Sequence, residues 1–288
     1  MEKALAGRIC LVAGASRGIG RGVAQALGDA GATVIVTARS SEVSRRTDSR
    51  PETIEDTARL VDEAGGRGFH YVCDHTSERE VDQLAAWALR RFGRIDLLVG
   101  CVWSGNEGLR DGRFPDGSSW GTPFWRRPTA LLGSMLEGAV QAQLLTARAV
   151  APAMVAAKKG LIVLITAADD GAYFGDIFYD LSKSAAARLA FGMAEDLKPF
   201  GVTALALAPG LARTERVMEA GLGDQAAESP LYAGRAIAAL ACDHEIAGYA
   251  GETLYVADLA ARYGFTDIDG SQPPRFRLAI NNQSGEGS

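Results

Sequence analysis

The sequence predicts an α/β fold in which a seven-stranded parallel sheet carries helices on both faces. Short apolar runs of strand length alternate with helical segments from residue 8 to about residue 258, and no linker interrupts them. The first apolar run, within 9–20, passes through a glycine-rich turn directly into a helix start, ICLVAGASRGIG. This order of strand, glycine turn and helix is typical of a single Rossmann-type, doubly wound domain.

The composition fits one domain that has no membrane or nucleic-acid partner. With 288 residues and 47% hydrophobic content, the chain can bury one large core or two small ones, and the uninterrupted pattern favours one. A net charge of -5 argues against nucleic acid or an anionic membrane surface as the main partner. No apolar run reaches membrane-spanning length, and the charged start MEKALAGRIC is unlike a signal peptide, so we expect a cytoplasmic protein.

The cysteines and histidines predict no metal site. The four cysteines lack CxxC or metal-ligand spacing, and the first three fall on predicted strands, so we expect reduced thiols in the core. The three histidines have no close histidine or acidic partners at ligand spacing. These residues are Cys10, Cys73, Cys101, Cys242, His70, His75 and His244.

The glycine turn is predicted to hold the pyrophosphate of a dinucleotide. Unpaired backbone N–H groups and the positive end of a helix dipole meet there, and both favour an anion. The spacing Gly14-x3-Gly18-x-Gly20 differs from the common G-x-G-x-x-G, and a turn without a ligand is the alternative interpretation. The turn residues that we assign to the coenzyme are Gly14, Ser16, Arg17, Gly18, Ile19 and Gly20.

Two arginines indicate which coenzyme is bound. A helix over 19–30 ends before Gly31, and the next strand, over 33–38, is followed by Arg39. An acidic residue at this place would bind the ribose 2′-hydroxyl, whereas an arginine accommodates a 2′-phosphate. Together with Arg17 in the turn, Arg39 favours NADPH over NADH, although either arginine alone could be an ordinary surface charge.

The first half continues with regular elements. A polar loop leads to Pro51, where we expect a helix that runs to Ala64. A strand over 69–73 and a helix over 78–92 follow, with Thr76 or Ser77 as the N-cap of that helix. Residues 94–99 then lead into the fourth strand.

The connection over 104–128 is unusually long. Loops of this length in a compact domain are usually functional or disordered, and the aromatic residues here argue against disorder. We expect a lid that covers an apolar substrate, with a dimer contact as the alternative. The aromatic residues in or beside the connection are Trp103, Trp120, Phe124 and Trp125.

The second half completes the sheet. A helix over 128–158 with small residues along one face precedes a strand over 160–165, and a long helix ends near Lys198. The last elements expected are a strand over 202–208, a helix over 233–242 and a strand over 251–256. The domain then comprises 1–258, with an extension over 259–280 packed on it and a disordered tail over 281–288.

Tyr179 and Lys183 are predicted to form an acid–base pair. Four residues apart on one helix, their side chains share a face. A lysine ammonium beside a phenol favours the phenolate and lowers the pKa of the tyrosine from about 10, so that Tyr179 can act as a general acid and base near neutral pH.

The glycine turn and this Y-x3-K motif resemble the short-chain dehydrogenase/reductase superfamily, over residues 8–258. The tail at 258–270 and the pair Phe124-Trp125 resemble its branch called dehydrogenase/reductase member 1. The resemblance implies that hydride passes from NADPH to a carbonyl carbon while Tyr179 protonates the oxygen and Lys183 holds the nicotinamide ribose. It also implies a homodimer or homotetramer that uses the helix over 128–158. The residues it places on the coenzyme are Asp74 and the adjacent His75 near the adenine, Cys101 beside strand four, and Pro209, Gly210 and Thr214 around the carboxamide.

The chain departs from the superfamily pattern at several catalytic positions. Gly100 to Trp103 replace the usual N-N-A-G, and no asparagine lies near Gly138 or Ala139, where the superfamily has a buried one. Ala167 stands at the position of the catalytic serine. Its neighbour Thr166 would face the opposite side of the strand unless a bulge at the strand end re-aims it.

Three functions are compatible with these departures. The first is an NADPH-dependent carbonyl reductase in which Thr166, a lid residue or water replaces the serine; losing one such donor costs roughly 3 kcal/mol of transition-state stabilisation. The second is an enzyme that acts on an imine or enone, or performs a non-redox step, because an imine needs protonation more than an oxyanion donor. The third is a protein that binds NADPH without turnover.

Overall fold

The computed structural model describes residues 3–44, 47, 50–105, 107, 109, 113–167, 171–224 and 228–277. Its strands form one parallel seven-stranded sheet in the order β3-β2-β1-β4-β5-β6-β7, which confirms the predicted fold class. The predicted tail over 281–288 lies outside the described residues. The strands are β1 Ile9–Ala13, β2 Thr33–Ala38, β3 Arg67–Val72, β4 Leu97–Gly100, β5 Gly160–Ile165, β6 Val202–Ala208 and β7 Thr253–Tyr255.

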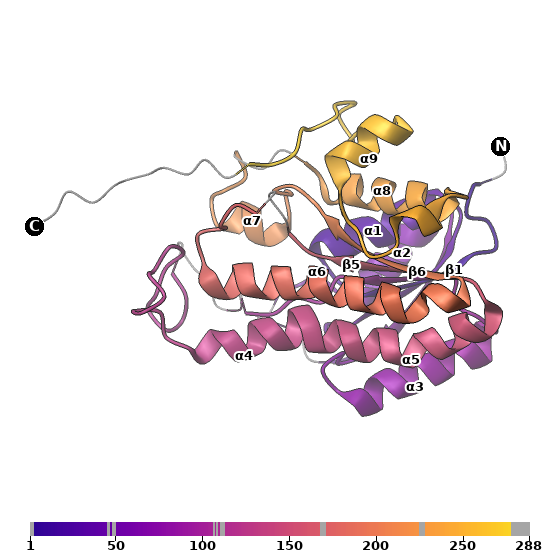
Figure 1. Cartoon of the computed structure of the whole chain (residues 1–288), viewed down its shortest axis with the longest axis horizontal. Helices are drawn as coiled ribbons and strands as arrows, with labels where there is room; N and C mark the ends of the chain where they lie inside the picture. The colour runs from indigo at the N-terminus through magenta and orange to yellow at the C-terminus, as the bar shows by residue number, and fades with distance from the viewer. Residues whose placement is uncertain are drawn as a thin grey trace, which may run out of the picture.

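Helices cover both faces of the sheet. One layer contains α1, α2, α8 and α9, and the other contains α3, α5 and α6 (Figure 1). The main helices are α1 Gly18–Asp29, α2 Ile54–Glu63, α3 Glu78–Phe92, α4 Ala130–Leu136, α5 Ala142–Ala157, α6 Ile177–Leu197, α7 Glu215–Glu219, α8 Pro230–Cys242 and α9 Val256–Tyr263. None of the described helices is both long enough and apolar enough to cross a bilayer.

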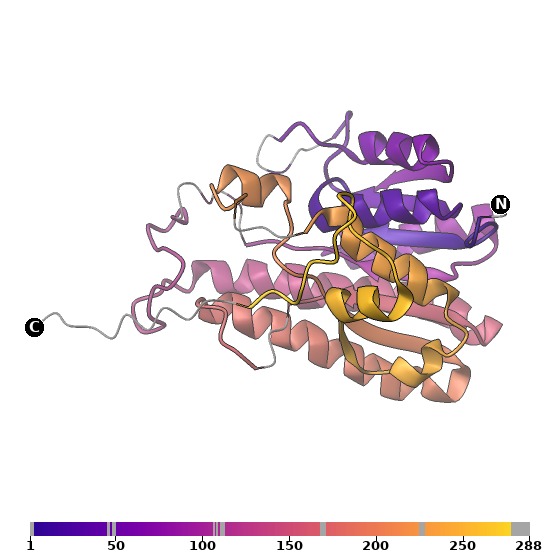
Figure 2. The same ribbon diagram turned by 90° about the horizontal axis from the view of Figure 1, so that it is seen from above.

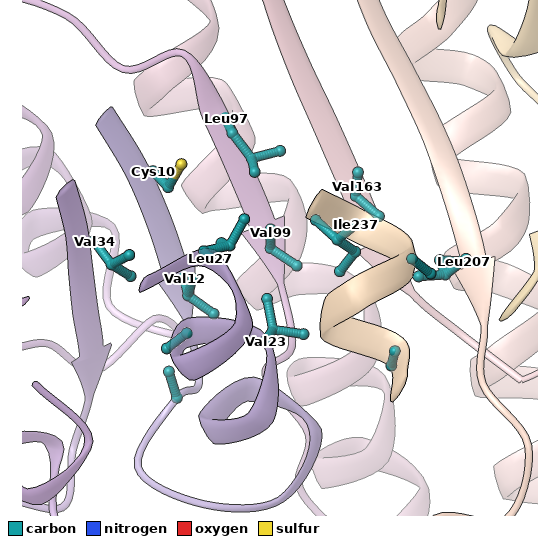
Figure 3. Close-up of a cluster of buried hydrophobic side chains, with 14 of the residues drawn as sticks. Cys10, Val12, Val23, Leu27, Val34, Leu97, Val99, Val163, Leu207 and Ile237 are labelled. Atoms are coloured by element: carbon teal, nitrogen blue, oxygen red, sulfur yellow. The ribbon is translucent and has the colours of Figure 1, made fainter. Parts of the chain in front are cut away.

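The alternation of side chains along the strands builds a separate core on each face. In β1, Cys10 and Val12 pack beneath α1 and α8, whereas Leu11 packs on the opposite side with α3, α5 and α6. Figure 3 shows the first of these cores, where Val23 of α1 and Ile237 of α8 meet the strands. Burial on both faces explains why the strands are continuous apolar runs instead of alternating ones.

The strand order reverses direction at β1. This strand lies between β2 and β4, so the connections leave its two sides in opposite directions and a crevice opens at its carboxyl end. In register, Ala13 pairs with Thr37 of β2 and Gly100 of β4. The ends of three strands are therefore level where the predicted coenzyme turn begins.

Three predicted helices differ in detail from the structure, and the one predicted over 233–242 begins at Pro230. The second helix starts at Ile54 instead of Pro51, because Thr53 and Asp56 form a reciprocal capping box around its first turn. The helix predicted over 128–158 is divided by a π-helical turn, Glu137–Gln141, between α4 and α5.

The described part of the predicted lid, 104–128, is organised by its own small core. Phe114 is 3% exposed and packs with Met135 of α4 and Phe178 of α6. In both views the lid and α7 lie at the end of the molecule opposite the N-terminus (Figures 1 and 2).

The chain after β7 also packs on the domain. The boundary predicted at residue 258 falls inside α9, whose Leu259 and Ala260 are buried in the core with α8. Further along, Asp267 accepts hydrogen bonds from the backbone and hydroxyl of Ser229.

Candidate active site

A cavity of about 880 Å³ opens at the carboxyl edge of the sheet. Its volume lies in the range of small-molecule and cofactor sites. All the residues that the sequence singled out for coenzyme binding or catalysis line it, although they come from nearly every part of the chain. They are Gly14, Ser16, Arg17, Gly18, Ile19, Gly20, Arg39, Asp74, His75, Cys101, Thr166, Tyr179, Lys183, Pro209, Gly210 and Thr214.

The glycine turn brings the backbone close to the cavity. Gly14 has a φ of +78°, and a Cβ there would lie 2.8 Å from the backbone of Val102. The N–H groups of Gly14 and Ala15 donate to the carbonyl of Thr37 at 2.8 and 3.0 Å, which closes the turn against β2.

The start of α1 already binds an anionic group. The side chain of the N-cap residue, Arg17, accepts no hydrogen bond from the first N–H groups of the helix. Instead, the N–H of Gly18 donates a 2.8 Å hydrogen bond to the carboxylate of Glu215, which begins α7 nearly two hundred residues later. The start of α1 therefore accepts a carboxylate of the same chain, as expected for the positive end of a helix dipole.

Cationic side chains cluster beyond the turn, at the end of β2. Arg17 donates to the hydroxyl of Ser40 at 2.8 Å and to the carbonyl of Thr47 at 3.4 Å. Arg39 forms an ion pair with Asp74 at 3.8 Å. Both guanidinium groups thus lie at one end of the cavity.

Asp74 is held ionised at the end of β3. Partial burial opposes its charge, but hydrogen bonds from the hydroxyl and N–H of Thr76 and the nearby Arg39 keep the pKa of Asp74 below its usual value.

The His75 ring links two elements of the core. Its nitrogens lie 2.8 Å from the hydroxyls of Thr37 and Thr146, and burial lowers the pKa of His75 to about 4. Since Thr146 gives its own proton to the carbonyl of Ala142, the neutral ring donates from Nδ1. Neither ring nitrogen is left to bind a ligand.

Tyr179 and Lys183 lie on the first two turns of α6 and face the cavity. Three aromatic rings surround the phenol ring, with centroid distances of 5.3 Å to Trp103, 5.1 Å to Trp120 and 5.7 Å to Phe174. The Lys183 ammonium lies 4.1 Å from the centre of the Trp103 ring and 5.5 Å from that of Tyr179.

This aromatic shell reverses the predicted pKa shift of the tyrosine. Burial raises the pKa of Tyr179 to about 12 and lowers that of Lys183 to about 8. The lowered pKa expected for Tyr179 is therefore wrong for the protein alone, because aromatic rings surround the half-buried phenol and the ammonium rests on the face of Trp103.

Thr166 and the π-turn lie beside the positions of the two polar residues that the superfamily has and this chain lacks. The Thr166 hydroxyl donates to the backbone carbonyl of Lys183 at 2.6 Å, so its proton ties β5 to α6. At Gly138 in the π-turn, a Cβ would lie 2.3 Å from the Ser104 hydroxyl, which leaves no room for an asparagine side chain.

Two further cavity residues were not found from the sequence. Trp103, which the sequence singled out only for the lid, also packs against Tyr179 and Lys183. Glu215 and Glu228 had no local signal, because each reaches the cavity through contacts between distant segments. The Glu228 carboxylate accepts a hydrogen bond from the Gly210 N–H, yet burial raises its pKa to about 7.

A protein-family model described as short chain dehydrogenase matches residues 8–225. The chain belongs to this family. Short-chain dehydrogenases are oxidoreductases that use nicotinamide coenzymes, and the cavity of this chain fits one: its anion-binding helix start, its arginines and its Tyr179-Lys183 pair share one space.

Known short-chain dehydrogenases resemble the chain over almost its whole length. "Dehydrogenase/reductase SDR family member 1" of Mus musculus is 33% identical, covering 94% of this chain and 86% of its own length. A putative dehydrogenase from Xanthomonas campestris is 27% identical with a TM-score of 0.76, covering 96% of this chain and 98% of its own. A metagenomic short-chain oxidoreductase solved in complex with NADP is 27% identical with a TM-score of 0.67, covering 88% of this chain and 97% of its own.

Glu228 makes the stability of this short-chain dehydrogenase depend on pH. It is 2% exposed, and folding raises its pKa from an ordinary 4.5 to about 7. Its contribution to the free energy of unfolding is fully present below pH 4.5. As the pH rises through 7, up to about 3 kcal/mol of this stabilisation is lost. Chemical denaturation at several pH values should show that the free energy of unfolding falls less with rising pH in Glu228→Gln than in the parent. The exposed Glu252→Gln is the control, and an equal pH dependence in Glu228→Gln would contradict the assignment.

Proposed function

We propose that the protein is an NADPH-dependent reductase that transfers a hydride to the carbonyl carbon of a small, largely apolar substrate. The observation that carries the proposal is the single cavity that joins the anion-binding start of α1 to Tyr179 and Lys183. The NADP-bound structural relative supports the choice of coenzyme. The lid residues that line the same cavity, including Trp120, supply an apolar wall for the substrate.

Each group has a distinct task in this reaction. The coenzyme supplies the hydride. Tyr179 donates its phenolic proton to the substrate oxygen as negative charge develops there, and Lys183 binds the ribose and stabilises the resulting phenolate. The pKa of about 12 for Tyr179 in the protein alone keeps the phenol protonated and ready to donate.

A second electrophile is favoured by one observation: neither Ala167 nor Thr166 offers a hydroxyl proton to the substrate. Ala167 has no hydroxyl, and the Thr166 proton is used by the Lys183 carbonyl. A carbonyl substrate would lack a donor worth roughly 3 kcal/mol, whereas an imine nitrogen needs mainly the proton of Tyr179. An imine or enone is therefore the alternative substrate class, and NADPH binding without turnover is the remaining alternative.

Tyr179→Phe should abolish turnover and leave coenzyme binding intact. We expect at least a hundredfold loss of NADPH oxidation with benzil or dihydroisoquinoline, because the proton donor is removed. The dissociation constant of NADPH should change by less than about threefold. An unchanged rate in Tyr179→Phe rules out its role as the acid.

Ala167→Ser should raise benzil reduction roughly tenfold or more if a carbonyl is the natural electrophile.

Arg17 and Arg39 should determine the preference for NADPH. Replacing either with alanine removes a charge-assisted hydrogen bond to the 2′-phosphate, and we expect NADPH to bind roughly ten- to a hundredfold more weakly. NADH affinity should stay within about twofold. Arg59→Ala removes an exposed guanidinium that pairs with Glu42 and Asp56. It is the matched control for the loss of one positive charge away from the proposed phosphate site. Equal losses for both coenzymes would contradict a 2′-phosphate site.

Glu215 should compete with the coenzyme for the start of α1. Its carboxylate uses the Gly18 N–H that a pyrophosphate needs. Glu215→Gln removes the negative charge, so NADPH should bind roughly two- to fivefold more tightly, as expected for a charge at a helix end. Isothermal titration with the parent and with Glu195→Gln, an exposed change on α6, provides the comparison. Weaker binding in Glu215→Gln would instead mean that the carboxylate assists the coenzyme.

The protein is also proposed to act as a cytoplasmic homodimer or homotetramer. Apolar side chains on the outer surfaces of α5 and α6 support this, since Leu144, Leu181 and Phe191 are 44%, 49% and 38% exposed.

A further inference from the structure

A buried ion pair connects the end of the lid to the start of the helix that bears Tyr179. Arg127 Nη2 and Asp176 Oδ2 lie 2.9 Å apart, and both side chains are 0% exposed. Neither of these two atoms has a hydrogen-bond partner elsewhere among the described residues. The pair is thus isolated from solvent, and Asp116 is a second carboxylate within electrostatic reach of Arg127.

The lid holds the guanidinium rigidly. Arg127 stacks 4.1 Å from the ring centre of Phe114 and 5.5 Å from that of Phe178. It also donates a hydrogen bond to the hydroxyl of Ser118. Three planar or directional contacts therefore fix its position before the carboxylate is considered.

The carboxylate in turn fixes the backbone of the catalytic tyrosine. Asp176 is the N-cap of α6, and its Oδ1 accepts hydrogen bonds from the N–H groups of Phe178 at 3.1 Å and Tyr179 at 3.0 Å. One oxygen of the carboxylate thus holds Tyr179, while the other faces the lid arginine.

A second contact joins the same two segments. The Trp120 indole N–H donates to the carbonyl of Phe174 at 2.8 Å, just before α6, and its ring packs 5.1 Å from that of Tyr179. The lid therefore meets the first turn of α6 both at the backbone and at the reacting side chain.

We propose that Arg127 is a positioning residue for Tyr179, acting through Asp176. This inference rests on the proposed role of Tyr179 as the acid. A buried ion pair contributes little net stability compared with an apolar pair of similar volume, so stability does not explain it. What the pair supplies is direction: it sets the angle at which α6 begins and hence where the phenol lies relative to the substrate. The serine and asparagine of the superfamily are replaced in this chain, so the Arg127–Asp176 ion pair restricts the position of Tyr179 from the side of the lid.

The test separates positioning from stability with paired variants. Arg127→Met leaves a buried carboxylate without a partner and should lower the melting temperature by roughly 10 °C. The double variant Arg127→Met/Asp176→Asn keeps an N-cap acceptor and removes both charges of the pair, so the melting temperature should recover most of the loss. Its kcat for benzil or dihydroisoquinoline should nevertheless stay roughly ten- to a hundredfold low, with the dissociation constant of NADPH unchanged. Arg148→Met, which breaks an exposed ion pair with Glu78, is the control and should leave kcat unaltered.

A second measurement does not depend on turnover. Hydrogen exchange over 176–180 should be faster in the double variant than in the parent, while exchange in the last turns of α6 stays the same. The inference would be overturned if the double variant recovered the kcat and the slow exchange of the parent as well as its melting temperature. If the parent binds NADPH but reduces neither probe, the proposed function fails, and unchanged exchange over 176–180 then overturns the positioning role separately.

Discussion

Parallel strands place all their carboxyl ends at one edge of the sheet, and every functional group of this protein depends on that constraint. The glycine turn follows β1, the arginine cluster follows β2, Asp74 follows β3, and Tyr179 begins the helix after β5. Because the strand order reverses at β1, these ends surround a crevice instead of a flat rim. The cavity is thus a product of topology, and the loops determine only its walls.

The walls of the cavity differ in chemical character from one end to the other. Backbone N–H groups and guanidinium groups dominate near α1, which favours phosphate. Aromatic rings dominate around Tyr179, where Lys183 rests on Trp103 instead of on a polar partner. Apolar surroundings keep both side chains in their neutral forms more readily than water would, which accounts for the shifts of both pKa values.

The lid belongs to the catalytic half of the molecule through its contacts. Phe114, Arg127 and Trp120 all reach α6 or the residues just before it. The lid is thereby connected to the phenol through packed side chains. The outer tip of the lid, by contrast, exposes Phe124 and Trp125 at 65% and 70%.

The sequence by itself determined the fold, the glycine turn after β1 and the shared helix face of Tyr179 and Lys183, because apolar periodicity and short spacings are local properties of a chain. The late start of α2 was also a local matter, since Thr53 and Asp56 were already at capping-box spacing. Only the tertiary structure decided that Glu215 lies on the Gly18 N–H and that Arg127 pairs with Asp176. It also decided the direction of the Tyr179 pKa shift. These outcomes depend on which distant loops pack together and exclude water, and no periodicity in the chain encodes that packing.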